Sequence, residues 1–227
     1  MDFELELPPL IPAMTLRDTV LFPQIVLPLY IFEPRYRAML QDVLEGDRLF
    51  AIVREADVTD SAENPAEPPS AYATVGIIRG AHKNADGTSN LVLQGIARVR
   101  VEGVETEEPY RVIRIAPVED DLSPDSETLQ ACQTALRRRV EGEGVGKDDL
   151  PQEFLDFMHS IEDPALYVDY LAYAVCSCPS TKQKILGTPT VLERYRIIEG
   201  YLDRCAQRNA LFQQLQGKTE DDRISLN

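Results

Sequence analysis

The chain has 227 residues, of which 44% are hydrophobic, so it can form one large domain or two small ones with a buried core. Its formal net charge at pH 7 is -15, and a surface this acidic repels nucleic acid and anionic lipid. The sequence does not begin with the basic region and apolar region of a signal peptide. No apolar run approaches the roughly 20 residues needed to span a bilayer. We therefore expect a cytoplasmic protein that binds neither nucleic acid nor membrane.

The first 32 residues predict short strands rather than helices. Leu5 to Met14 is apolar but contains prolines, which favours an irregular edge strand. An almost continuous apolar run follows from Val20 to Phe32, and Pro23 and Pro28 interrupt it. Prolines at this spacing exclude a helix, because proline has no amide donor and clashes with the preceding turn. We expect two strands joined by a turn at Phe22-Pro23-Gln24, with Pro28 at a sheet edge or a bulge.

A short amphipathic helix follows these strands. After Pro34, apolar residues recur at a spacing of three and four as far as Gly46. This spacing forms one stripe along a helix, Pro34 suits its first turn, and Gly46 suits its end. The stripe consists of Tyr36, Met39, Leu40, Val43 and Leu44.

Four further strands follow the helix. Their apolar residues alternate with polar ones or form compact runs, and Gly95 favours a bend or bulge in the third strand. Strands of this length around one short helix indicate a small, mostly antiparallel barrel or pseudo-barrel. The predicted strands are Leu49–Val53, Tyr72–Ala81, Ser89–Val104 and Tyr110–Val118.

An acidic loop, Glu55 to Ser70, separates the first two of these strands. It contains acidic residues and prolines but no basic residue. The composition predicts a solvated surface loop, and the functional alternative is a lid or a partner-facing segment.

The second part of the chain predicts helices, because the hydrophobic period changes near Glu119-Asp120 from two to about 3.6. The first helix is expected to start at Ser123-Pro124, and a short helix is expected to be capped by Ser180. The last helix begins near Thr188-Pro189 and carries a heptad-like seam typical of a helical bundle. The seam consists of Val191, Tyr195, Ile198, Leu202, Cys205, Asn209 and Phe212.

These patterns predict an α+β fold. We expect a β subdomain at residues 1–119, a helical subdomain at residues 120–217 and a polar tail at residues 218–227.

Several segments resemble the substrate-binding (N-terminal) domain of Lon proteases. The sequence VLFPQIVLPLYIFEPRYRAML, residues 20–40, is similar to the opening of that domain, although Gln24 stands where the family usually has glycine. With similar segments in the strands and helices, the resemblance covers about residues 7 to 216. It implies a PUA-like, mostly antiparallel β pseudo-barrel with one short helix, followed by a C-terminal α-helical bundle. It also implies a stand-alone form of the domain, without the ATPase and protease modules of Lon.

No catalytic machinery is recognisable, so we expect no enzymatic activity, no cofactor and no metal. Gly142 to Lys147 looks superficially like a phosphate loop, but the first glycine of that motif and the Ser/Thr that holds magnesium are both missing. No G-x-S-x-G motif is present, and nothing pairs a nucleophilic serine with an activating lysine. His82 and His159 have no evident partner, so we expect surface or structural histidines.

The cysteines lack the spacing of common zinc and redox sites, and all lie in helix-like segments. We therefore expect buried structural thiols, since a free cysteine packs as a small hydrophobic residue. They are Cys132, Cys176, Cys178 and Cys205.

The candidate polypeptide-binding residues lie around the Phe-Pro turn and the start of the first helix. The turn offers apolar side chains, and an arginine could hold a carboxylate or carbonyl oxygen of a partner. The structural alternative, which we favour, is that Arg35 pairs with a nearby acid and Tyr36 packs in the core. The candidates are Phe22, Pro23, Ile25, Arg35 and Tyr36.

A basic stripe is expected on one sheet face if the predicted strands pair. In a chain this acidic, such a stripe is expected to neutralise nearby acids rather than bind RNA. Its members are Arg98, Arg100, Arg111 and Arg114.

The resemblance implies a non-catalytic module that binds unfolded or partly folded protein segments, as an adaptor for a separate protease or chaperone. The expected surface is the Phe22-Pro23 turn or a groove between barrel and bundle. Two alternatives remain open. One is a small-molecule-binding protein or cryptic enzyme that uses the cleft between barrel and bundle, and the other is an RNA-binding module, because the family's barrel resembles the PUA fold. A deep pocket with converging polar groups would favour the first, and a basic face the second.

Overall fold

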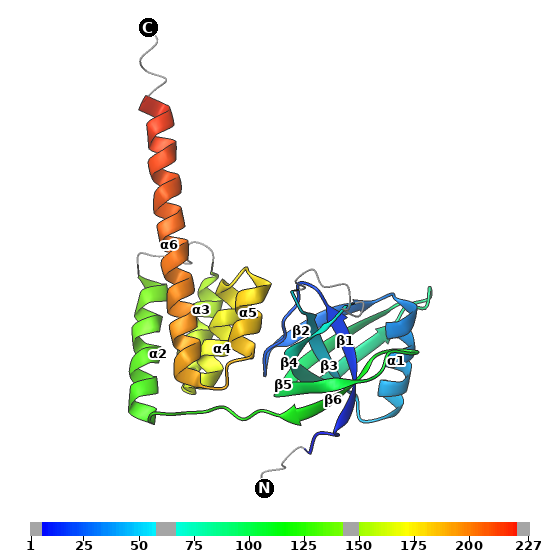
Figure 1. Ribbon diagram of the computed structural model, residues 1–227. Helices are drawn as coiled ribbons and strands as arrows, with labels where there is room; N and C mark the ends of the chain where they lie inside the picture. Colours follow the sequence, from blue (N-terminus) through cyan, green and yellow to red (C-terminus); the bar gives the residue numbers. More distant parts are fainter. Residues whose placement is uncertain (1–5, 58–66, 143–149, 222–227) are drawn as a thin grey trace. The chain divides into compact units, whose positions relative to one another are not determined.

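A computed structural model describes residues 6–57, 67–142 and 150–221, with side chains up to residue 212 (Figure 1). In these residues the chain forms both strands and helices, which confirms the predicted α+β class. The strands are β1 (Leu10–Leu16), β2 (Val26–Ile31), β3 (Leu49–Glu55), β4 (Pro69–Lys83), β5 (Ser89–Thr106) and β6 (Val112–Pro117). The helices are α1 (Pro34–Glu45), α2 (Ser126–Glu141), α3 (Gln152–Ser160), α4 (Pro164–Val175), α5 (Pro179–Leu186) and α6 (Val191–Asp221). Among the described residues, no helix is long and apolar enough to cross a membrane.

The strands close into a pseudo-barrel around β5, the longest of them. One edge of β5 pairs with β4. The other edge pairs first with β2 and then, in its second half, with β6. β1 completes the ring, antiparallel to β6 and parallel to β3. The order β2-β5-β4-β3-β1-β6 thus confirms the mostly antiparallel barrel that the sequence predicts.

The barrel core consists of branched and small apolar side chains that alternate along the strands. α1 packs beside the barrel and buries Tyr36, Met39, Leu40 and Val43, as its stripe predicts, while Leu44 stays exposed (Figure 1). The core residues are Ile11, Ala13, Leu49, Ala51, Val53, Ala73, Val75, Val99, Ile113 and Ile115.

Two predictions for the first 32 residues are wrong. β1 is not an edge strand, because β3 and β6 pair with its two edges. Residues 20–22 form no strand, although their side chains are buried. The carbonyl of Leu21 instead accepts a hydrogen bond from Thr74 Oγ1 at 2.6 Å, so this segment packs against β4 without joining the sheet. The predicted edge position of Pro28 is confirmed, since β2 ends the strand order.

The turn after Phe22 lies directly on Gly95 of β5. Gln24 N donates a hydrogen bond to Gly95 O at 2.8 Å, and Gly95 N donates one to Ile25 O at 2.9 Å. A Cβ on Gly95 would overlap the carbonyl oxygen of Phe22, so this close approach requires glycine. The β4–β5 register also shifts here, as the predicted bulge implies.

Helix α1 begins at Pro34, as predicted, but α2, α5 and α6 begin two or three residues away from their predicted starts. Asp125, not Ser123, caps α2 by accepting a hydrogen bond from Thr128 N at 2.7 Å. Cys178, not Ser180, occupies the N-cap position of α5. The α6 seam is buried from Val191 to Cys205 but exposed at Asn209 and Phe212, and the helix continues into the predicted polar tail.

The chain divides into two compact units, and one of them is discontinuous in sequence. The first unit comprises residues 1–121 and 169–189, and the second comprises residues 122–168 and 190–227. The segment 169–189, which the sequence analysis groups with the helices, thus belongs with the sheet. A buried ion pair explains this, since Asp169 accepts hydrogen bonds from Arg98 Nη2 at 2.9 and 3.1 Å.

Replacing Gly95 by alanine should lower the free energy of unfolding by about 2 to 3 kcal/mol, because the new Cβ overlaps a backbone oxygen. Gly103→Ala, in the same strand, is the matched control, since nothing lies within 4 Å of a Cβ added there. Denaturant titration measures both variants, and equal unfolding midpoints would contradict the steric argument.

Gln24 offers a stabilising change. Its φ is 64°, in the left-handed region, where a side chain costs about 1 kcal/mol or more. Gln24→Gly removes that strain and should raise the melting temperature in a thermal scan. Gln24→Ala keeps the strain and loses only the contact with Gln94 Nε2 at 3.2 Å, so it serves as the control. A melting temperature for Gln24→Gly at or below that of Gln24→Ala would refute this.

Candidate functional site

Three of the five predicted site residues lie in the core. Phe22, Ile25 and Tyr36 are each at most 5% exposed. The hydroxyl of Tyr36 donates to Thr15 O at 3.0 Å and accepts from Thr15 N at 3.2 Å, and burial raises its pKa. Such side chains support the fold and offer no surface to a partner, as the structural alternative predicts for Tyr36.

Arg35 is already engaged by acids. Its two terminal nitrogens bind both carboxylate oxygens of Glu67, at 2.8 and 3.0 Å, and its Nε donates to Glu33 at 3.0 Å. These hydrogen bonds from Arg35 lower the pKa of Glu67. Arg35 therefore fills the structural role, and Pro23 is half-buried.

The arginines of the predicted stripe are neutralised, as expected. Each forms an ion pair with an acid, so the stripe presents no free basic face. The pairs are Arg98–Asp169, Arg100–Glu102, Arg111–Glu107 and Arg114–Glu105.

An apolar patch that the sequence analysis missed lies on the exposed face of β2. Tyr30 and Phe32 are 53% and 59% exposed, and their rings stack with centroids 6.0 Å apart. Val26 and Pro28 share this face because side chains alternate along a strand, and Val92 lies opposite Pro28 on β5. We call Val26, Pro28, Tyr30, Phe32 and Val92 the β2 patch. Contiguous exposed apolar surface of this kind marks interaction sites.

A depression of about 520 Å³ adjoins the β2 patch and is lined by Pro28, Tyr30 and Val92 together with residues of β4. Gly80 is one of them, and a Cβ added there would meet nothing within 4 Å. A side chain at this position would therefore occupy the depression without disturbing the strand.

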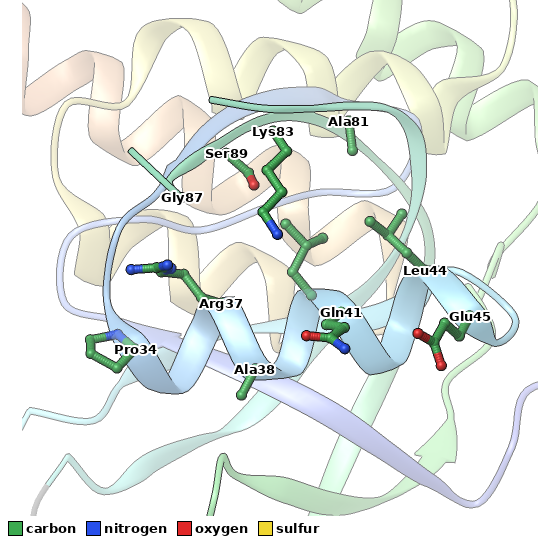
Figure 2. A pocket seen from close by; sticks show the side chains of 11 residues that line it. Pro34, Arg37, Ala38, Gln41, Leu44, Glu45, Ala81, Lys83, Gly87 and Ser89 are labelled. Carbon is green, nitrogen blue, oxygen red and sulfur yellow. The ribbon is translucent and has the colours of Figure 1, made fainter. Parts of the chain in front are cut away.

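A second hollow, of about 730 Å³, lies between α1 and the β4–β5 hairpin, and we call it the α1 groove (Figure 2). Leu44 of α1 and Ala81 of β4 supply apolar surface, and Leu40 is buried beneath it. Arg37 of α1 and Lys83 of β4 supply positive charge.

The described residues contain no group of three or more His, Cys, Asp or Glu side chains that could hold a metal ion. His159 is exposed and pairs with Glu141 at 2.9 Å, and His82 is exposed on β4. Both are surface histidines, as expected. The predictions for the phosphate-loop-like segment and the acidic loop fall mainly on residues 143–149 and 58–66, outside the described residues.

The prediction of buried thiols is wrong for Cys178, which is exposed. It lies between α4 and α5, where the chain is not helical, and its sulfur lies 3.3 Å from Ser180 Oγ. Hydrogen bonds from Ser180 and from Thr181 lower its pKa to about 7. Cys176 and Cys205 are buried, and Cys132 is partly buried.

Cys178 should therefore be the fast-reacting thiol. Because its pKa is lowered, the thiolate forms as the pH rises through about 7, whereas an ordinary cysteine ionises near about 8.5. Alkylation by iodoacetamide, followed by mass spectrometry, should reach half its plateau rate near that lower pH. Ser180→Ala should move the midpoint upward, and Cys178→Ser should abolish the fast phase. A midpoint unchanged by Ser180→Ala would contradict this assignment.

The comparisons with known proteins agree with this fold. Residues 10–204 match the family model of the ATP-dependent protease La (LON) substrate-binding domain. The chain belongs to this family. The resemblance seen in the sequence is thereby confirmed.

Full-length relatives are much longer than this chain. Lon protease of Syntrophus aciditrophicus is 29% identical over 96% of this chain, and Lon protease of Dictyoglomus thermophilum is 28% identical over 88%. The matched regions are 28% and 25% of those proteases, so this chain spans about a quarter of their length.

Two solved structures share the fold. The N-terminal domain of Mycobacterium avium complex Lon protease has a TM-score of 0.68 at 17% identity, over 86% of this chain and 98% of that one. The Lon N-terminal domain protein from Xanthomonas campestris has a TM-score of 0.58 at 21% identity, over 85% of this chain and 98% of that one.

Proposed function

We propose that this chain is a non-catalytic protein-recognition module that binds unfolded or partly folded polypeptide, and that the β2 patch is its binding surface. In this proposal it serves as an adaptor, which presents the bound segment to a separate protease or chaperone in the cytoplasm. Membership of a substrate-binding family supports the recognition role.

The observation that carries the proposal is the exposed Tyr30–Phe32 pair. Two stacked aromatic rings, each more than half exposed, stand on an edge strand of a protein with net charge -15. Aromatic side chains give the largest contributions at binding surfaces, since they bury much area at little cost in conformational entropy. Folded proteins keep most apolar side chains inside, so such a surface favours chains whose apolar segments are exposed.

The patch also replaces the surface suggested by the sequence. Phe22 and Ile25 are buried at the turn that leads into β2, and Tyr36 is buried on α1 with its hydroxyl bonded to Thr15 of β1. In the proposal they act by positioning the exposed residues, while Pro23 and Arg35 lie near the surface but contact no substrate.

The test measures binding of a fluorescently labelled, permanently unfolded protein and of its folded counterpart, by anisotropy at two salt concentrations. The unfolded form should bind preferentially, and the affinity should change little with salt, because apolar contacts are not screened. Combining Tyr30→Ser with Phe32→Ser should weaken binding by about tenfold or more. Gly80→Gln adds a side chain beside the depression, and its Cβ would meet nothing within 4 Å, so it should weaken binding as well.

Leu122→Ser is the matched control, since it removes an exposed apolar side chain outside the patch and should leave the affinity unchanged. Equal binding of folded and unfolded protein would overturn the proposal. So would an equal loss of affinity in the Leu122 control.

A further inference from the structure

The α1 groove differs from the β2 patch in its chemistry. Its side chains combine an apolar surface with a concentration of hydrogen-bond donors at one end, and its volume of about 730 Å³ is typical of small-ligand sites. Lys83 and Ser89 of the hairpin line the α1 groove, whereas Gly80, His82 and Asn90 line the depression beside the β2 patch. Ala81 lines both, so the two hollows are neighbours on the hairpin with mostly different linings.

Two positive side chains in the groove form no close ion pair with the part of the chain that the structure describes. At least nine other arginines form ion pairs in this acidic chain. Within the described residues, neither Arg37 nor Lys83 has a carboxylate oxygen within 4.0 Å. Asp86, in the hairpin turn, accepts hydrogen bonds from Thr88 N and Oγ1, at 3.0 and 2.6 Å. These hydrogen bonds and, to a smaller extent, the charge of Arg37 lower the pKa of Asp86.

The positive groups are oriented into the groove. Lys83 and Ser89 point from the hairpin toward α1, and Arg37 points from α1 toward the hairpin turn (Figure 2). The guanidinium of Arg37 rests against Gly87, where a Cβ would overlap its Nη2 atom. Ser89 is only 7% exposed, and its hydroxyl forms no hydrogen bond with a described residue, so it can donate into the groove. A guanidinium, an ammonium and a hydroxyl are the donors that proteins use for oxyanions.

The rest of the lining selects among anions. The exposed Leu44 lies along α1 beyond Arg37, and Glu45 lies about 12 Å from Arg37 along the helix axis. The charged side chains of the lining are Arg37, Lys83 and Glu45, and Asp86 lies close enough to Arg37 to interact with its charge. These four charges sum to zero, so a monoanion adds less excess negative charge than a phosphate dianion would in a protein that is already strongly acidic.

We propose that the α1 groove binds a carboxylate attached to an apolar body, with Arg37, Lys83 and Ser89 on the carboxylate and Leu44 and Ala81 on the body. Such a group occurs in free aliphatic acids and at the carboxyl end of a polypeptide that finishes in an apolar residue. The inference is independent of the β2 patch, because it uses none of the residues of that patch and a different recognition chemistry.

The first experiment tests the shared chemistry by isothermal titration of the full chain with octanoate, octanamide and acetate. Octanoate should bind and the other two should bind at least about tenfold more weakly, since each lacks either the charge or the apolar body. Arg37→Gln and Lys83→Gln should each weaken octanoate binding by about tenfold. Arg100→Gln is the matched control, because it removes an exposed arginine of β5 outside the groove, and it should change nothing.

The second experiment separates the two sources with an octapeptide that ends in leucine, used as the free acid and as the C-terminal amide. Binding of the acid, in competition with octanoate and without binding of the amide, assigns the groove to polypeptide ends. Binding of octanoate alone assigns it to free acids, and both results support the proposal. The proposal would be overturned if octanoate and octanamide bound equally, or if neither octanoate nor the peptide acid bound. It would also be overturned if Arg100→Gln weakened binding as much as the groove variants do. Peptide binding that depends on Tyr30 and Phe32 but not on Arg37 and Lys83 would leave the function of the β2 patch intact and remove this one.

Discussion

The close approach of the Phe22 carbonyl to Gly95 is the constraint on which the arrangement of the sheet face depends. Because β5 has no side chain there, the segment after β1 can cross the sheet, bury Leu21 and Phe22, and return as β2 along the edge of β5. The two hydrogen bonds between this turn and Gly95 then fix the register of β2. That register decides which residues of β2 face the solvent, so the patch is a consequence of the glycine.

The sequence patterns were sufficient for the class of fold and for most elements. The period of α1 and the alternation along β5 are local signals, and both match the structure closely. The segment from Val20 to Phe22 misled the prediction, because an apolar run reports burial but not hydrogen bonding with a neighbouring strand. The prolines of β1 misled it too, since Pro12 is accommodated opposite Val112 within a strand that is paired on both edges.

The candidate site was harder to predict for a related reason. Phe22 and Phe32 lie in one short stretch, yet Phe22 is buried and Phe32 is exposed. In the same stretch Tyr36 is buried and Tyr30 is exposed. The chemistry that suits a binding surface also suits a core, and the place of each side chain in the folded structure separates the two. An alternation from Val26 to Phe32 was the available signal, but the sequence does not say which set of residues faces outward. The α1 groove left no signal, since Arg37 and Lys83 come together only when the helix packs beside the hairpin.

The buried pair of Arg98 and Asp169 has a consequence for how this protein is made. The two residues are 71 positions apart, and both are nearly inaccessible to water. Until residues 169–189 are available, Arg98 of an unfinished barrel must either stay hydrated or be buried with fewer acidic partners. Burial of an incompletely paired charge is strongly unfavourable. Domains usually fold in order from the amino terminus as they leave the ribosome. Here the first unit is completed by residues 169–189, which are synthesised after residues 122–168 of the second unit. The early strands are therefore the part of the nascent chain that stays exposed for the longest time.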